Sequence, residues 1–285
     1  METIRIGSGY GKRKLPDLGG IIYRRGEHCK SNENDLVVIM AGFARIATQE
    51  KLLLSIAEKI KKPVLIFDWH GLGSSEGDFG DLTVERLLTD LKRMIGAMKE
   101  KGFSKFHLVG HSFAACVIAM AINDPIINAG KRVLLAPALN QRFLLRYWFA
   151  KEKGYDFNIN SWAAYSNLRM KAHARTDPAF DGLWKHEEEF LSECGKARLI
   201  KGIAIRPDYW QTESCMDYSG YFPSDHMRKQ ITCNQTLCIH GGHDSSIPVE
   251  VIEGSFESFV QIGQTDHFFT GAEDKVATIV SEFIG

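Results

Sequence analysis

The sequence has no surplus of charge of either sign and no long apolar run. Its 285 residues carry 35 Lys and Arg against 35 Asp and Glu, whereas a nucleic-acid-binding surface needs a basic excess to neutralise phosphates. No stretch approaches the roughly 18 consecutive apolar residues of a membrane-spanning helix, and residues 1–14 lack the apolar core of a signal peptide. We therefore expect a soluble, cytoplasmic protein with no nucleic-acid partner and no membrane span.

Closely paired cysteines are absent as well. The six cysteines are scattered, at Cys29, Cys116, Cys194, Cys215, Cys233 and Cys238. Four residues separate Cys233 from Cys238, but Cys238 falls in a predicted strand and no second ligand pair follows at zinc-finger spacing. We expect reduced thiols, no metal site and no cofactor.

The chain does contain apolar runs of strand length, separated by segments of helix length. The runs are nearly continuous, as in strands buried on both faces, and cover residues 36–40, 63–67, 106–109, 133–135, 236–239 and 256–260. Amphipathic segments such as 49–60 and 83–99 carry Leu and Ile at helical spacing. This alternation predicts an α/β fold, a mostly parallel sheet with helices on both faces.

Two parts of the chain depart from the alternation. Residues 4–6 and 20–24 are strand-like with no helix between them, which predicts an antiparallel hairpin at the sheet edge. Residues 138–228 lean towards helix and hold 16 of the 30 aromatic residues (17 Phe, 8 Tyr and 5 Trp). We predict a cap at 138–228 inserted into a core of residues 1–137 and 229–285. Its aromatic side chains either form the core of the cap or line an apolar ligand pocket, and both can hold for different residues.

The strongest chemical signal is a serine between a predicted strand and a predicted helix. Ser112 has Gly110 two residues before it and Ala114 two residues after it. Small residues at these positions let strand and helix approach closely, so the turn projects the serine hydroxyl from the sheet edge as a nucleophile. The alternative is that Ser112 caps the helix N-terminus.

A serine nucleophile needs a base, and the base needs an acid that orients it. Asp244 lies in a glycine-rich turn after the 236–239 strand, and His267 lies in the loop after the last strand. Both positions fall at the carboxyl edge of a parallel sheet, where ligand sites lie. We predict Ser112, Asp244 and His267 as the catalytic residues, with Asp266 as the alternative acid.

Other histidines compete for the role of base. His111 adjoins the nucleophile, so we expect its side chain to point away from Ser112 and to pack or to bond backbone. His70, His240 and His243 fall in predicted edge loops, where a structural role is expected for each.

Acyl transfer at a serine also needs donors for the oxyanion of the tetrahedral intermediate. One donor is the backbone N–H of the residue after the nucleophile, and the other comes from the loop after the third strand. These positions predict the N–H groups of Phe113 and Phe43 as the oxyanion hole.

The turn around Ser112, the loop at residues 40–43, the segment at 67–79, the Gly242-His243-Asp244 turn and the Asp266-His267-Phe268 segment resemble the α/β-hydrolase superfamily. The likeness is greatest to its small esterases of the cinnamoyl and feruloyl type and to the serine aminopeptidase-like and lysophospholipase-like hydrolases. It covers residues 18–138 and 232–284 and implies an α/β-hydrolase fold with the triad and oxyanion donors named above.

Three positions depart from the family pattern. Ala41 stands where relatives have His before the oxyanion glycine, Leu72 stands where they have His between glycines, and Ala114 replaces glycine. None of these changes removes a triad member.

The expected activity is hydrolysis of a carboxylic ester of a small, largely apolar acyl substrate. The same triad would serve an acyl thioesterase or an acyltransferase, and the loop at residues 41–45 resembles that of bacterial luminescence acyl transferases. A non-catalytic ligand receptor that keeps the fold and the pocket is the alternative from a different class.

Overall fold

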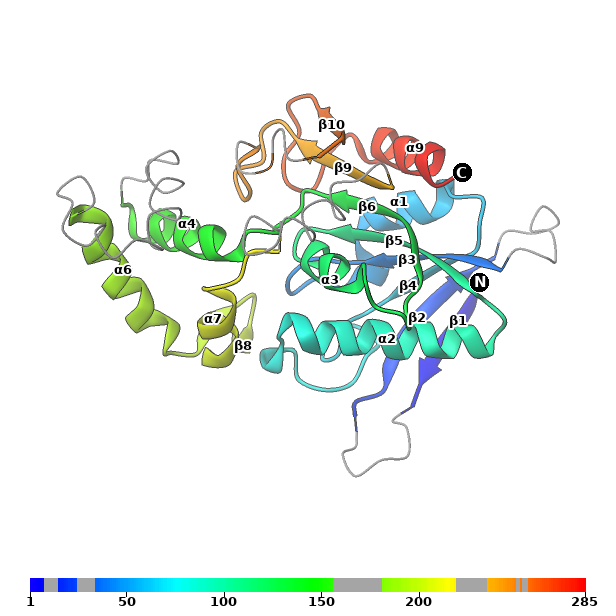
Figure 1. Cartoon of the computed structure of the whole chain (residues 1–285), viewed down its shortest axis with the longest axis horizontal. Helices are drawn as coiled ribbons and strands as arrows, with labels where there is room; N and C mark the ends of the chain where they lie inside the picture. The colour runs from blue at the N-terminus through cyan, green and yellow to red at the C-terminus, as the bar shows by residue number, and fades with distance from the viewer. Residues whose placement is uncertain (8–14, 25–33, 156–180, 219–234, 250–251, 253–255) are drawn as a thin grey trace.

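An eight-stranded sheet runs through the molecule in the order β1-β2-β4-β3-β5-β6-β9-β10 (Figure 1). The computed structural model describes residues 1–7, 15–24, 34–155, 181–218, 235–249, 252 and 256–285. The strands are β1 (Glu2–Ile6), β2 (Leu18–Tyr23), β3 (Asp35–Met40), β4 (Val64–Phe67), β5 (Lys105–His111), β6 (Ala129–Leu135), β9 (Thr236–Gly241) and β10 (Ser258–Ile262).

The six strands from β4 to β10 in this order are parallel, and the first two pair antiparallel at one edge. Every residue of β4, Val-Leu-Ile-Phe, is buried. Such a strand needs cover on both faces. The structure confirms the predicted mostly parallel sheet and the N-terminal hairpin at its edge.

Each face of the sheet has its own apolar cluster, and β3 contributes to both. Leu36, Val38 and Met40 pack towards α2 (Val84–Glu100) and α3 (Ala114–Ala121). Val37 and Ile39 pack towards α1 (Lys51–Lys59) and α9 (Glu273–Ile284). The alternation follows from the period of two in a strand, and helices cover both faces as predicted (Figure 1).

Several strand boundaries differ from the sequence prediction, and those of β9 and β10 change the position of a candidate histidine. β9 continues through His240 to Gly241, because these two residues pair with Gln261 and Ile262 of β10. β10 correspondingly begins at Ser258 rather than at Phe256. His240 is therefore a buried strand residue, and its assignment to an edge loop is wrong.

The described part of residues 138–228 contains three helices and a small hairpin. The helices are α4 (Gln141–Lys153), α6 (Asp181–Cys194) and α7 (Pro207–Glu213), and the hairpin joins β7 (Arg198–Ile200) to β8 (Ile203–Ile205). The hairpin was not predicted. Its two-residue turn has both Lys201 and Gly202 at positive φ, 49° and 83°, as tight hairpin turns require.

A buried ion pair joins the helices of this segment. The Arg146 guanidinium on α4 donates two hydrogen bonds of 2.6 Å to the carboxylate of Glu187 on α6. It also donates to the carbonyl of Ser214 after α7, at 2.8 Å. The aromatic side chains Phe149, Phe190 and Tyr209 belong to the same apolar cluster as the α2 and α3 face of the sheet. The division of the chain into core and cap stays a prediction.

The described cysteines, Cys116, Cys194, Cys215 and Cys238, are free thiols. Cys29 and Cys233 lie outside the described residues, and so does the spacing between Cys233 and Cys238. No group of three or more metal-binding side chains occurs among the residues that the structure describes. None of the described helices combines the length and the apolar character that a bilayer crossing requires.

Candidate active site

Ser112 occupies a tight turn between β5 and α3. Its φ is 54°, in the left-handed region that a serine rarely adopts. The turn is held by hydrogen bonds from Ser112 N to Leu135 O at 2.8 Å and from Ala115 N to Ser112 O at 3.1 Å. The N-cap residue of α3 is Phe113, without a side-chain cap bond, so the interpretation of Ser112 as a helix cap is wrong.

The chain packs too closely around this turn for larger side chains. A Cβ atom on Gly110 would lie 2.7 Å from Ile118 Cδ1 and 3.1 Å from Ala114 Cβ. A Cβ atom on Gly42 would lie 2.9 Å from Ser112 Cβ. Real Cβ contacts are essentially never shorter than 3.0 Å, so a side chain at position 42 would push against Ser112, whereas one at position 110 would displace the end of the Ile118 side chain and crowd Ala114. Ala114 is fully buried and fits because Gly110 opposite it has no side chain.

Asp244 and His267 form a buried hydrogen-bonded pair. His267 Nδ1 lies 2.7 Å from Asp244 Oδ2, while Asp244 Oδ1 accepts from the N–H groups of Ser246 at 2.8 Å and Ile247 at 2.9 Å. Burial by itself raises the pKa of Asp244, but the bond to His267 and these two N–H groups outweigh it and lower the pKa overall. The carboxylate is thus kept ionised and aimed at the imidazole.

Asp266, the alternative acid, points elsewhere. Its Oδ1 accepts from the N–H groups of Phe268 at 3.1 Å and Thr270 at 2.9 Å, and its Oδ2 accepts from the Thr270 hydroxyl at 2.8 Å. These bonds tie down the loop that carries His267. The hydrogen-bonded partner of His267 is Asp244.

His111 supports the same loop from the opposite side. Its Nε2 donates to the backbone carbonyl of His267 at 2.9 Å, and the two rings are 4.8 Å apart. The backbone bond was expected, but His111 also lines the cavity at Ser112, whereas it was expected to point away. Complete burial, with the nearby His267 charge, lowers the pKa of His111 to about 3, so the ring is neutral at physiological pH.

The remaining candidate histidines have structural surroundings. His70 Nδ1 lies 2.6 Å from Asp90 Oδ2, in a buried pair that ties the loop after β4 to α2. His240 Nδ1 donates to Gly241 O at 2.8 Å. His243 is exposed on the turn before Asp244.

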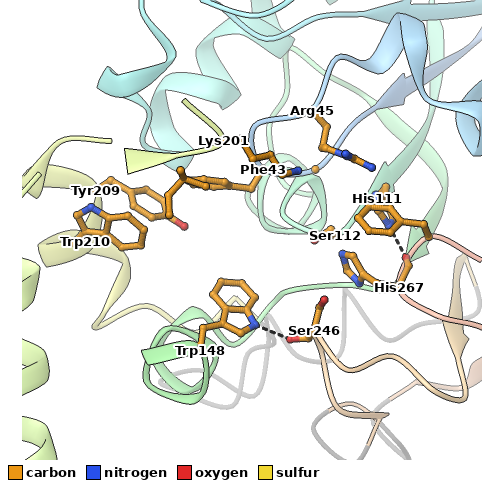
Figure 2. A pocket seen from close by; sticks show the side chains of 13 residues that line it. Phe43, Arg45, His111, Ser112, Trp148, Lys201, Tyr209, Trp210, Ser246 and His267 are labelled. Atoms are coloured by element: carbon orange, nitrogen blue, oxygen red, sulfur yellow. Dashed lines mark hydrogen bonds between the residues drawn. The ribbon is translucent and has the colours of Figure 1, made fainter. Parts of the chain in front are cut away.

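Ser112 and His267 line one cavity of about 280 Å³ (Figure 2). Aromatic side chains form much of its wall, Phe43 from the loop after β3 and Trp148, Tyr209 and Trp210 from α4 and α7. Phe43 packs on the ring of Tyr209 at 5.2 Å. Sequence reasoning had predicted that some aromatic residues of 138–228 line a pocket, but it could not say which.

Other aromatic residues of the same segment pack in the interior. Phe149 and Phe190 pack edge to face with ring centroids 5.5 Å apart, and both are buried. Some aromatic residues of the segment thus line the cavity, and others are buried in the apolar cluster that the segment shares with the α2 and α3 face of the sheet.

Sequence reasoning missed two basic residues of the cavity wall, Arg45 and Lys201. Arg45 lies two residues beyond Phe43, so the prediction that this loop reaches the site could have pointed to Arg45 as well. Lys201 lies in the unpredicted β7–β8 turn, and only the Lys-Gly pair hinted at that turn.

Solved structures of similar fold cover nearly the whole chain. Est1E from Butyrivibrio proteoclasticus, in a structure with ferulic acid bound, has a TM-score of 0.68 and 17% identity, over 99% of this chain and 97% of that one. Alpha/beta hydrolase domain-containing protein 10 from mouse has a TM-score of 0.60 and 14% identity, over 100% and 98%. An alpha-beta serine hydrolase homologue from Coxiella burnetii has a TM-score of 0.54 and 14% identity, over 100% and 97%.

At such identities the likeness to these structures shows the fold alone. Comparison with curated protein sequences finds no match. The family model described as "Alpha/beta hydrolase family" matches residues 42–277, well over half of the chain. That span includes the Ser112 turn, the Asp244 turn and His267, and the chain therefore belongs to the alpha/beta hydrolase family.

Proposed function

We propose that the protein is a serine esterase with Ser112 as nucleophile, His267 as base and Asp244 as the acid that orients it. The observation that carries the proposal is the Asp244–His267 pair at 2.7 Å, beside a cavity that Ser112 also lines from a left-handed turn. A hydroxyl is a weak nucleophile until a base takes its proton, and this arrangement supplies the base and its orienting carboxylate.

In the proposed reaction, His267 Nε2 takes the Ser112 proton as Oγ attacks the ester carbonyl carbon. His267 then donates this proton to the leaving alcohol, which gives an acyl-enzyme and a neutral imidazole. His267 then deprotonates a water molecule that attacks the acyl carbon, and as the bond from this carbon to Oγ breaks, His267 returns the proton to Ser112 Oγ, which releases the acid and restores the enzyme. The low pKa of His111 matters here, because a neutral neighbour does not repel the imidazolium that forms on His267.

The oxyanion of the tetrahedral intermediate would be held by the backbone N–H groups of Phe43 and Phe113. Within the described part of the chain, neither N–H donates to another backbone group, so neither is already used in a backbone hydrogen bond. Gly42 brings the first of these loops against Ser112, since a Cβ atom there would lie 2.9 Å from Ser112 Cβ. Preorganised donors of this kind are worth roughly 2.7–4 kcal/mol each in other enzymes.

The cavity supports a small, largely apolar acyl substrate. It measures about 280 Å³ and has walls of Phe43, Trp148, Tyr209 and Trp210, and aromatic walls bind flat or apolar groups by burial and ring contact. The ferulic acid bound to Est1E, a protein of similar fold, is an aromatic acid and fits the same expectation.

Labelling with a fluorophosphonate tests the proposal. We expect stoichiometric labelling of the wild type, none in Ser112→Ala, and labelling slowed by orders of magnitude in His267→Gln, with melting temperatures showing that each variant is folded. Unchanged labelling in Ser112→Ala would refute the assignment of the nucleophile.

Substrate comparison separates the alternatives that use the same triad. A p-nitrophenyl ester series is measured against acyl-CoA thioesters, and we expect kcat/KM to favour the esters. Preference for thioesters by orders of magnitude would identify a thioesterase or an acyltransferase. Complete inertness towards the probe, together with a saturable shift in melting temperature on adding a small ligand, would identify a receptor.

A further inference from the structure

Two basic side chains lie on the wall of the cavity at Ser112 (Figure 2). Arg45 comes from the loop after β3, two residues beyond the proposed oxyanion donor Phe43. Lys201 comes from the β7–β8 turn and lies near Phe43 and Arg45 (Figure 2). No acidic side chain is among the described residues that line the cavity, since Asp244 lies behind His267.

Arg45 is held in place by an acid and an aromatic ring. Its Nε lies 2.6 Å from Glu50 Oε1, and its Nη2 donates to Glu50 Oε2 at 3.3 Å. The guanidinium carbon lies 4.4 Å from the ring centroid of Phe268, the residue after His267. Glu50 therefore compensates the charge of Arg45, and the ring fixes its plane.

Lys201 has no such compensation. Its amine makes neither an ion pair nor a hydrogen bond with any residue that the structure describes. The residue as a whole is exposed, but partial burial of the amine, with the nearby charge of Arg45, lowers the pKa of Lys201, against the opposite effect of Glu50. The positive charge of Lys201 therefore has no acidic partner of its own among the described residues beside the apolar cavity.

We propose, building on the esterase activity proposed above, that the substrate is an ester that carries an oxyanion group, a carboxylate or a phosphate, which Lys201 and Arg45 bind while Ser112 attacks the ester carbonyl. Both cations donate to carboxylate and phosphate oxygens, and such charge-assisted bonds are stronger than neutral ones. Apolar walls strengthen the attraction because they exclude water from around the pair.

The tight turn fixes the backbone position from which the Lys201 side chain extends. Positive φ at Lys201 and Gly202 belongs to a two-residue hairpin turn, which allows little variation of the backbone. Ile200, the residue before it, lines the cavity. The amine is thus presented at the end of an apolar wall, as suits a substrate with an apolar body and one charged end.

A matched pair of esters tests the proposal. The probes are p-nitrophenyl hydrogen glutarate, which carries a free carboxylate, and p-nitrophenyl pentanoate, which is neutral and of similar length. In the wild type we expect kcat/KM for the anionic ester to exceed that for the neutral ester by about ten-fold, because a hydrogen bond to a charged group is worth about that much. The ratio should fall as salt is raised.

Variants assign the preference to its residue. Lys201→Gln should reduce the ratio of the two kcat/KM values to near one, and Lys201→Arg should restore it. The matched control is Lys196→Gln, because Lys196 lies nearby on the chain, does not line the cavity and pairs with Glu193 at 2.8 Å. This control should leave the ratio unchanged.

Inhibition of pentanoate ester hydrolysis in the wild type requires no variant. Glutarate or propyl phosphate should inhibit at lower concentration than pentanol, and the better of the two identifies the oxyanion as carboxylate or phosphate.

A ratio of the two kcat/KM values near one in the wild type, or a ratio unchanged by Lys201→Gln, would overturn this inference while fluorophosphonate labelling of Ser112 upheld the esterase. If neither ester is cleaved and Ser112 is not labelled, both proposals fail together.

Discussion

The indole Nε1 of Trp148 donates a hydrogen bond of 2.6 Å to the backbone carbonyl of Ser246, two residues after Asp244. Ser246 in turn donates its N–H to Asp244 Oδ1 at 2.8 Å. Lys151, about one helical turn further along α4, donates to the carbonyl of Ser245 at 3.0 Å. A helix of the predicted cap thus fixes the loop that holds the proposed catalytic carboxylate.

Trp148→Phe should therefore weaken catalysis as well as the cavity wall. The change keeps an aromatic ring but removes the N–H, which leaves the Ser246 carbonyl without this donor and costs about 1 kcal/mol. We expect kcat to fall about three- to ten-fold and the melting temperature to fall by about 2–4 °C. Enzyme kinetics and thermal unfolding measure the two effects.

Tyr147→Phe is the matched control, because it removes a longer bond of 3.2 Å to the neighbouring carbonyl of Ser245. Tyr147 does not line the cavity. If both substitutions lowered kcat equally, the Trp148 bond would have no special part in holding the acid loop.

Asp244→Asn should remove most of the activity, while Asp266→Asn should not. An amide at position 244 cannot stabilise the imidazolium of His267 and favours the wrong tautomer, which costs about 10⁴-fold in kcat in another triad enzyme. Asp266→Asn should lower kcat only slightly, since the amide oxygen still accepts the loop bonds from Phe268 and Thr270.

Rates of ester hydrolysis for these two variants, with wild type alongside, check the assignment of the acid. A loss in Asp266→Asn as large as that in Asp244→Asn would contradict it, provided that both variants melt near the wild-type temperature.

Glu213 should make stability depend on pH near neutrality. The side chain is buried, and its Oε2 accepts a bond of 3.0 Å from the Tyr218 hydroxyl. Burial raises the pKa of Glu213 to about 7, partly offset by that bond, from an ordinary value of 4.5. Well below pH 4.5 the carboxyl is protonated in both the folded and the unfolded chain, so its burial does not lower the free energy of unfolding through ionisation.

As the pH rises from 4.5 to 7, the unfolded chain releases this proton first, so the free energy of unfolding falls. Above about pH 7 the loss is complete and amounts to about 3 kcal/mol. Glu213→Gln should remove it, so the variant should be more stable than the wild type at about pH 8 and nearly equal to it at about pH 4. Denaturant titrations at both values measure this, with exposed Glu188→Gln as the control. If the free energy of unfolding changed equally with pH in wild type and in Glu213→Gln, the raised pKa of Glu213 would be refuted.

Removing one partner of the Arg146–Glu187 pair should destabilise the fold strongly, whereas replacing both partners by apolar residues should change stability much less. Arg146→Met leaves the Glu187 carboxylate buried without its cation, and such a loss costs about 3–5 kcal/mol. The double variant Arg146→Met with Glu187→Leu removes both charges and should recover most of that stability. Denaturant unfolding of the two variants gives both numbers. A double variant no more stable than the single one would show that the pair contributes more than mutual compensation.

The proposed catalytic residues could be predicted from sequence because each follows a strand whose apolar run is local and readable. A strand, a tight turn and a helix around Ser112 leave few arrangements, and the loops of Asp244 and His267 end at the same edge of the sheet. Local geometry also favours Asp244 over Asp266, because a residue directly before His267 in the chain is poorly placed to bond its side chain.

The missed features depend on contacts between distant segments. β9 includes His240 because β10 pairs with it, and His111 faces the cavity because the His267 carbonyl receives its N–H from across the site. Lys201 reaches the cavity only once the β7–β8 hairpin is placed against the loop after β3. No local pattern carries these relationships.

One apolar cluster constrains how the sequence can change during evolution. It joins Phe149, Phe190 and Tyr209 to the α2 and α3 face of the sheet. Tyr209 is at once a buried side chain of that cluster and part of the cavity wall. Substitutions that reshape the wall for a different ligand therefore also perturb folding. Lys201, on an exposed turn, is freer of that constraint, so new binding preferences of the cavity should arise at this position first.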